Sequence, residues 1–322
     1  MYRRGRDMSL WKLKLGMIGT LALIIGVTTL FLAIILEYMG MLTPLTLIIF
    51  VAALNFAQWL FAPYLIEFVY KVKPVDPGHW LQETVAKIAE RSGIAPPKVM
   101  LAEIPVPNAF AYGSPLTGNR VAVTRGLLES LRREEIEAVL AHEIGHLVHR
   151  DVQVMMVVSI LPAIFYIIGR SLILSGYYQR RDREGSSGFV ILLGFASLVV
   201  SFILQLFVLG LSRLREYYAD AHAATTIEDG ATKLQLALAK IVKDTSRLAK
   251  AGVNLAAFSD FRTLFIADPT SSVREALEIR GDYRLVEELK SQKLSFESRL
   301  LEIFSTHPHI VKRLRALDEF RK

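Results

Sequence analysis

The sequence predicts a mainly α-helical integral membrane protein with a small β-sheet, and three observations lead to this fold class. The chain has 322 residues, of which 52% are hydrophobic, and its mean hydropathy of +0.36 is high for an entirely soluble protein. Up to four apolar stretches are long enough to cross a bilayer as helices. The remaining segments show the patterns of amphipathic helices and short strands.

Charge and cysteine content narrow the possible partners and chemistry. The net charge is +7, but no nucleic-acid motif accompanies the basic residues and many of them flank apolar stretches. We therefore expect a lipid bilayer, and not nucleic acid, as the partner. The chain has no cysteine, which excludes disulfides, thiol catalysis and Cys-ligated zinc, so a metal site would have to use His, Asp or Glu.

The first part of the chain, residues 1–70, is predicted to be a membrane hairpin with spans at about 15–36 and 42–66. The first span is an uncharged run of 22 residues, without the cleavage site of a secretory signal. Basic residues precede it, whereas the turn at 37–41 has none. The positive-inside rule then places the N-terminus and the soluble part of the chain in the cytoplasm, with the protein multi-pass in the cell membrane.

Residues 71–151 and 213–322 have the composition of two soluble parts of one domain. In the first, HWLQETVAKIAERSG predicts a helix, KVMLAEI and NRVAVTRG predict strands, and IPVPNAFAYGSPLTG between them has a loop-like composition. RREEIEAVLAHEIGHLVHR then predicts one helix. The second part is predominantly helical, with helices expected at DGATKLQLALAKIVKDTSRLAK, PTSSVREALEIRG and PHIVKRLRALDEF.

Residues 152–212, between the two soluble parts, are predicted to form a second membrane hairpin. Its apolar stretches run from Val152 to Tyr178 and from Phe189 to Ser212. The polar loop that joins them contains three arginines, which would lie outside if both stretches cross. Two alternatives remain: the hairpin is shallow, or the earlier spans dictate its orientation.

The motif HEIGH carries the first chemical signal. His142 and His146 are four residues apart, so they lie on one helix face, while Glu143 is rotated from His142 by about 100°. Two metal-binding imidazoles beside a carboxylate base are typical of zinc peptidases, although the motif alone also fits a solvated helix face. The metzincin class is excluded, because its Gly and third His would stand where His149 and Val152 are found.

The third ligand is predicted to come from LSRLREYYADAHAA. There Glu216 and Asp220 lie four residues apart and face the same way, so Glu216 can bind the metal while Asp220 accepts a hydrogen bond from a ligand imidazole. If both motif helices continue into the adjoining apolar helices and these pair, the ligands arrive at similar depth. We therefore predict one Zn²⁺ ion held by His142, His146 and Glu216.

Taken together, HEIGH, RLREYYAD, PNAFAYG, STHPHIVKRLRAL and the order of the apolar stretches resemble the HtpX family of membrane zinc metalloproteases. This family is related to the type I CAAX prenyl protease and to Oma-type proteases. The resemblance covers essentially the whole chain. It implies a gluzincin-like endopeptidase that degrades unfolded, misfolded or damaged membrane proteins in membrane quality control.

The resemblance also implies roles for further residues. Asn108, Ala109 and Phe110 match the segment that borders the substrate cleft, and His307 and Arg313 match positions that stabilise the oxyanion. Glu143 is expected to take a proton from the attacking water and to deliver it to the leaving nitrogen.

Two other functions are weighed against the protease. An inactive membrane adaptor with the same fold would be favoured by loss of Glu143 or of a zinc ligand, and all of these residues are present. A prenyl-protein processing enzyme of the related family has more spans than the four candidates found here. The sequence leaves the oligomeric state and the natural substrates open.

Overall fold

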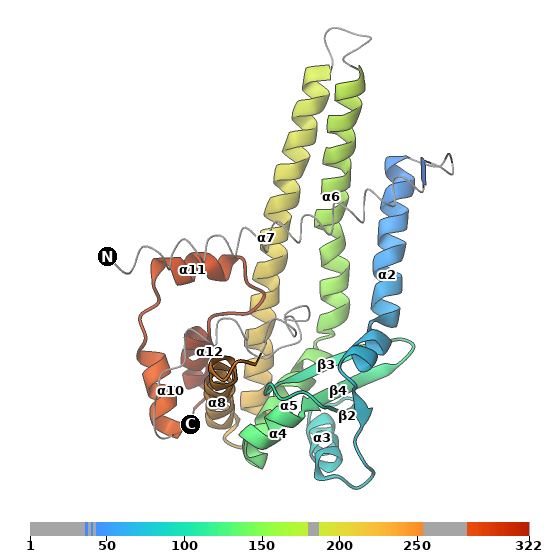
Figure 1. Cartoon of the computed structure of the whole chain (residues 1–322). Coiled ribbons are helices and arrows are strands. Elements are labelled where there is room, and N and C mark those ends of the chain that lie inside the picture. Colours follow the sequence, from blue (N-terminus) through green and yellow to red (C-terminus); the bar gives the residue numbers. More distant parts are fainter. Residues whose placement is uncertain (1–35, 38–39, 41–42, 180–186, 254–281, 322) are drawn as a thin grey trace. The chain divides into compact units, whose positions relative to one another are not determined.

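The computed structural model describes residues 36–37, 40, 43–179, 187–253 and 282–321 (Figure 1). Most of the first predicted span, at 15–36, and the helix predicted at PTSSVREALEIRG lie outside the described residues. The chain divides into two compact units, one of Met1–Ala57 with Ile160–Ser201 and one of Gln58–Ser159 with Phe202–Lys322. Each unit is described by itself.

Three long apolar helices run through the boundaries between the units. They are α2 (Pro44–Val69), α6 (Asp151–Gln179) and α7 (Ser187–Thr226). By length and composition each is able to cross a membrane. They correspond to the second, third and fourth apolar stretches of the sequence.

In the first unit, α6 and α7 pack closely through small residues. A Cβ added to Gly194 would lie 2.8 Å from the carbonyl oxygen of Gly169. The Ser197 hydroxyl donates to the carbonyl oxygen of Phe165, and that of Ser201 to the carbonyl oxygen of Pro162, both at 2.7 Å. Small side chains and hydroxyl-to-backbone bonds of this kind are typical of contacts between membrane helices.

The second unit is built around a four-stranded sheet with the order β1-β2-β4-β3. Its strands are β1 (Lys73–Pro74), β2 (Lys98–Ala102), β3 (Ala109–Ser114) and β4 (Gly118–Thr124). β2 pairs with β4 in parallel, while β1 pairs with β2 and β3 pairs with β4 antiparallel. The two predicted strands are β2 and β4.

The segment IPVPNAFAYGSPLTG is not a loop throughout, as its composition suggested, because it contains strand β3. Its small and aromatic residues pair with β4 from Ala109↔Val123 to Ser114↔Gly118, which places β3 at an edge of the sheet. The prolines and glycines around it suggested a loop, but pairing with β4 decides its conformation.

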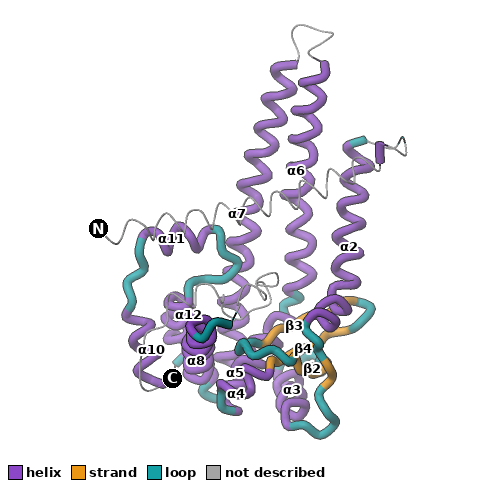
Figure 2. Tube along the Cα trace, viewed as in Figure 1, coloured by secondary structure: helices purple, strands orange, loops and turns teal. Residues whose placement is uncertain are grey.

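Helices α3 (Trp80–Arg91), α4 (Arg125–Ser130), α5 (Arg133–Val148) and α8 (Gly230–Lys250) share one hydrophobic core with the sheet and with α12 (Ile310–Leu317). In this core α5, which carries HEIGH, packs against α3, α8 and β3 (Figure 2). α12 is fixed to α8, where the side-chain amide of Gln235 donates to the carbonyl oxygen of Leu314 at 2.6 Å. The described C-terminal part also contains α10 (Asp282–Ser291), α11 (Phe296–Ile303) and the short 3₁₀ helix η2 (Asp318–Phe320).

Only one of the two motif helices continues into its adjoining apolar helix. α7 continues without a break from its apolar part through Glu216 to Thr226. α5, however, ends at Val148, and Arg150 has a φ of 54°, so the chain turns before α6 begins at Asp151. The HEIGH helix and the third apolar helix are therefore separate elements, and the condition of continuity is not met there.

Candidate active site

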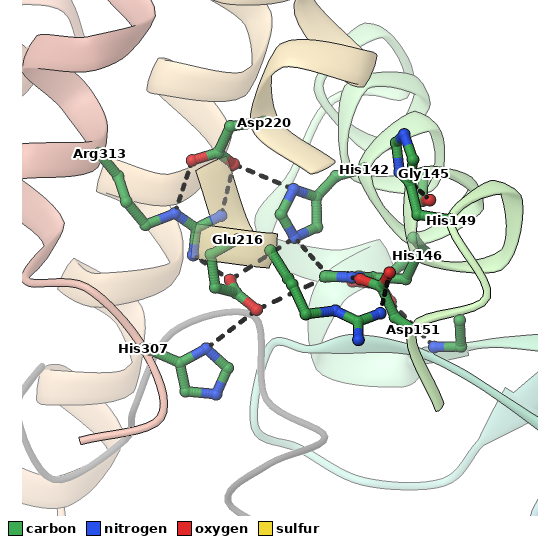
Figure 3. A network of polar contacts seen from close by, with 12 residues as sticks. His142, Gly145, His146, His149, Asp151, Glu216, Asp220, His307 and Arg313 are labelled. Atoms are coloured by element: carbon green, nitrogen blue, oxygen red, sulfur yellow. Dashed lines mark hydrogen bonds and ion pairs between the residues drawn. The ribbon is translucent and has the colours of Figure 1, made fainter. Parts of the chain in front are cut away.

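The two halves of the site meet where α5 crosses α7. Gly145 of HEIGH makes this approach possible, because a Cβ there would lie only 3.2 Å from the Cα of Ala219 and 3.1 Å from the Cβ of His222. The close contact brings the His142 face of α5 against the Glu216 face of α7 (Figure 3).

Three potential metal ligands converge at this crossing. His142 Nε2 lies 3.2 Å from His146 Nε2, and the carboxylate of Glu216 lies 3.8 Å from the former and 3.6 Å from the latter. The ligand atoms of a tetrahedral zinc site, with bonds of about 2.0–2.1 Å, lie roughly 3.3 Å apart. The three donors match this spacing and all lie within 4.8 Å of one another. Their chemistry and geometry therefore fit a metal such as zinc.

Each histidine is oriented by a carboxylate on its other nitrogen. His142 Nδ1 lies 3.0 Å from Asp220 Oδ1, the contact expected from the sequence. His146 Nδ1 lies 2.5 Å from Asp151 Oδ2, and Asp151 also pairs with Arg215. A carboxylate that accepts from Nδ1 leaves Nε2 unprotonated toward a metal.

The sequence did not point to Asp151. Asp151 lies five residues after His146, which is not a same-face spacing on a helix, and it reaches the imidazole only because the chain turns at Arg150. The only sequence feature that could have indicated Asp151 is the charged run HRD, which lies between the HEIGH helix and the third apolar stretch.

Arg313 of α12 is the buried cation of the site. Its Nε and Nη2 donate to Asp220 at 2.8 and 2.6 Å, and its Nη1 lies 3.1 Å from Glu216 Oε2. One guanidinium thus compensates two buried carboxylates and holds them in a fixed orientation.

His307, which precedes α12, also reaches the site. It is buried, and its Nδ1 lies 3.2 Å from Glu216 Oε1. His307 and Arg313 thus contact the two oxygens of the same carboxylate (Figure 3). The structure therefore brings together six of the polar residues named from the sequence: His142, His146, Glu216, Asp220, His307 and Arg313.

Glu143 is buried beside the ligands and faces strand β3. Its Oε2 accepts a hydrogen bond from the backbone N–H of Ala111 at 2.9 Å. Burial raises the pKa of the Glu143 carboxyl to about 7, while nearby His146 and the Ala111 N–H act in the opposite direction. Burial also lowers the pKa of His142, which favours the neutral imidazole that a metal requires.

The segment Asn108–Phe110 lies at the start of β3. The backbone of Asn108 is fixed to Thr124, whose N–H and hydroxyl both donate to the Asn108 carbonyl oxygen. Ala109 is buried, and the ring of Phe110 packs at 5.6 Å from that of Tyr112 in a hydrophobic cluster. The Phe110 side chain is therefore part of the core.

A pocket of about 250 Å³ opens beside His146. It lies between the end of α5, the β3–β4 hairpin and the start of α6. Its lining includes Tyr112, Asn119, Leu147 and Gln153.

Comparison with known proteins gives concordant results. Residues 76–321 match the family model described as Peptidase family M48. A protein named Protease HtpX homolog from Aeropyrum pernix is 40% identical over 94% of this chain and 95% of its own length. Protease HtpX homolog 2 from Saccharolobus solfataricus is 41% identical over 86% of each chain. The crystal structure of S. mikatae Ste24p has a similar fold, with a TM-score of 0.53 and 21% identity, over 97% of this chain and 67% of that chain.

Proposed function

The chain belongs to peptidase family M48 and is a membrane-associated metalloprotease, and from this premise we propose that it is a zinc-dependent endopeptidase of membrane protein quality control. The observation that carries the proposal is the convergence of His142, His146 and Glu216 beside the buried carboxylate of Glu143. Its substrates are unfolded, misfolded or damaged membrane proteins, and its catalytic part faces the cytoplasm.

One zinc ion is proposed to be held by the Nε2 atoms of both histidines and by the Glu216 carboxylate. Bound there, zinc supplies Lewis acidity, which polarises a carbonyl and lowers the pKa of a water toward about 7. The protein supplies the orientation: Asp220 and Asp151 fix the two imidazoles, and Arg313 fixes Glu216.

Glu143 is proposed to be the general base and then the general acid. It takes a proton from the water that attacks the peptide carbonyl and delivers this proton to the leaving nitrogen. Its burial supports this role, because a carboxyl that titrates near neutral pH can both accept and release a proton.

The substrate backbone is proposed to add to the edge of β3. Since the Ala111 N–H points to Glu143, it faces away from β4, and alternation along a strand places the N–H groups of Ala109 and Gly113 on the same side. A peptide paired there would run past the ligands, with a side chain beside the pocket next to His146. In this arrangement Asn108 and Phe110 fix the position of the edge strand.

His307 is proposed to stabilise the oxyanion that forms from the peptide carbonyl, as the family resemblance implied. Its contact with Glu216 places it at the metal-facing side of the site. For Arg313, the same role was expected from the sequence. Its three short contacts with Asp220 and Glu216 favour instead an action through these carboxylates.

The test compares the wild type with Glu143→Gln in detergent, using casein as an unfolded substrate and measuring zinc content in both. Glu137→Gln is the matched control, because Glu137 lies on the same helix and pairs only loosely, at 3.7 Å, with Lys233. We expect equal zinc in all three proteins and cleavage by the wild type and Glu137→Gln alone. Cleavage by Glu143→Gln at the wild-type rate would reject the assigned base.

A further inference from the structure

Helix α11 exposes an apolar face that no described part of the protein covers. On this face Phe296 is 74% exposed and Leu300 is 42% exposed, and two more exposed residues, Ile303 and Phe304, follow. These positions are spaced by four, three and one residues, which defines one stripe of a helix. Three large exposed hydrophobic side chains on a helix of eight residues, with a fourth at its C-cap, mark an interaction surface.

The C-terminal end of α11 is attached to α7 at Arg213. A single guanidinium nitrogen of Arg213, Nη1, donates to the carbonyl oxygens of Glu302, Ile303 and Ser305 at 2.8–3.0 Å. Glu302 and Ile303 are the last two residues of α11 and Ser305 follows it, so Arg213 adds a donor where a helix runs out of N–H partners for its carbonyls. A cation there also faces the negative end of the helix dipole.

Arg213 marks the end of the apolar part of α7. The sequence carries no charged residue from Ser187 to Ser212, and Arg213 is the first charge after this run. If α7 crosses the bilayer, Arg213 lies where the hydrocarbon ends and the headgroups begin. The hydrogen bonds from Arg213 then hold the end of α11 at the same level.

The exposed apolar surface of α7 reaches the level at which α11 is attached. A groove of about 480 Å³ lies beside Arg213 and is lined from α7 by Phe207 and Leu214, which are 70% and 56% exposed, and from α11 by Glu302. In Figure 1, α11 runs across the direction of α7 and not along it. A helix that lies across a membrane span at the end of its apolar part lies in the plane of the membrane surface.

We propose that α11 is an in-plane membrane helix, with Phe296, Leu300, Ile303 and Phe304 inserted at the boundary between lipid headgroups and acyl chains. Arg299, exposed at the border of this stripe, extends to the headgroups. The proposal rests on the insertion of α7 in the bilayer. The lipid is favoured over a second protein copy because Arg213 attaches α11 beside the exposed apolar side chains of α7, which lipid has to cover in any case.

The segment that follows α11 leads directly into the proposed catalytic site. Phe304 is three residues before His307, and Arg213 donates to Ser305 within this short connection. Attachment to the membrane therefore holds the segment that places His307 beside Glu216.

The cysteine-free chain permits a direct test by single labelling. Cysteine replaces Phe296, Leu300, Phe207 or Lys87 in the full-length protein, each variant receives an NBD fluorophore, and the protein is reconstituted in vesicles of phosphatidylcholine and phosphatidylglycerol. Phe207 is the control for lipid contact, and Lys87, whose side chain is 64% exposed on α3, is the control for water contact. Zinc content checks that each variant is folded.

We expect labels at Phe296 and Leu300 to be quenched by lipids that carry a shallow doxyl group, and iodide to quench them at least about threefold less than the label at Lys87. Iodide quenching equal to that at Lys87, with Phe207 quenched by lipid, would overturn the proposal while α7 remains inserted. If the labels at Phe296 and Leu300 were shielded from both quenchers, and this shielding disappeared when the protein was diluted in lipid, the stripe would be a contact between protein copies. That outcome would also overturn the proposal. Lack of lipid quenching at Phe207 would show that α7 is not inserted in the bilayer and would overturn the proposal with it.

Discussion

The His146 imidazole and the Asp151 carboxylate lie 2.5 Å apart across the turn between α5 and α6. The second histidine of the proposed metal site is thereby oriented by the first residue of an apolar helix, while His142 is oriented by Asp220 on another helix. Arg215 of α7 pairs with Asp151 and so joins α7 to this turn. The two imidazoles are held from different elements, which gives the site rigidity in two directions.

Replacing Asp151 by Asn should weaken metal binding. Asn keeps the size of the side chain and can still accept from Nδ1, but it loses the negative charge that raises the basicity of His146. We expect zinc affinity to fall by about 10- to 100-fold, measured by competition with a chelator. Asp229→Asn is the control, since Asp229 is exposed outside the site. Unchanged zinc affinity in Asp151→Asn would show that the contact does not tune the ligand.

Replacing Arg313 by Gln should destabilise the second unit strongly. Asp220 and Glu216 would then lose their shared buried cation, and breaking a buried pair on one side costs about 3–5 kcal/mol. Thermal unfolding in detergent measures the effect. Arg125→Gln is the comparison, because Arg125 also makes two bonds to one carboxylate, that of Glu103, but at the surface. A drop in stability no larger than that of Arg125→Gln would contradict the role given to Arg313.

Pairing of substrate with β3 predicts an alternating sensitivity to backbone methylation. If the edge of β3 receives the peptide through Ala109, Ala111 and Gly113, only every second amide of the peptide donates to the strand. A peptide substrate N-methylated at one position at a time should therefore lose cleavage efficiency at alternate positions, by about 5- to 10-fold for a lost hydrogen bond. Cleavage is measured relative to the unmethylated peptide. Equal losses at neighbouring positions on one side of the cleaved bond would reject pairing with this edge.

The residues that sequence reasoning found lie at helical spacings. His142 and His146 are four residues apart, as are Glu216 and Asp220, and both pairs lie on regular helices as expected. Helix periodicity is local, so it places side chains on a face without knowledge of the fold. The meeting of the two pairs depends on the close contact at Gly145, which the spacing alone did not predict.

The features that sequence reasoning missed depend on distant parts of the chain. β3 has a loop-like composition and becomes a strand through its pairing with β4. Asp151 reaches His146 only because Arg150 breaks the helix with a φ of 54°. His307 and Arg313 were found through resemblance alone, since about ninety residues separate them from Glu216.

The C-terminal helices should lose stability in acid through Asp318. Burial acts to raise the pKa of this carboxyl, but hydrogen bonds from Lys290 and Gln235 outweigh burial and lower the pKa below its usual value. A carboxyl with a lowered folded-state pKa stabilises the fold above its unfolded pKa of about 3.9, and this stability is lost as the pH falls through the folded value. Since Asp318 connects α10 and α8 to the end of α12, the protection factors of the α12 amides against hydrogen exchange should fall below about pH 4 in the wild type.

Asp318→Asn should reduce this acid dependence and lower the protection of α12 already at pH 7, because the carboxylate that pairs with Lys290 across α10 and α12 is absent at every pH. Glu83→Gln is the matched control: the pKa of Glu83 is also lowered, by a hydrogen bond from Lys87, but this pair lies at the surface of α3. Its exchange in α12 should follow the wild type. If Asp318→Asn kept the same pH profile as the wild type in α12, the acid sensitivity would have to arise from other carboxylates, and the link between α10 and α12 would not depend on this ion pair.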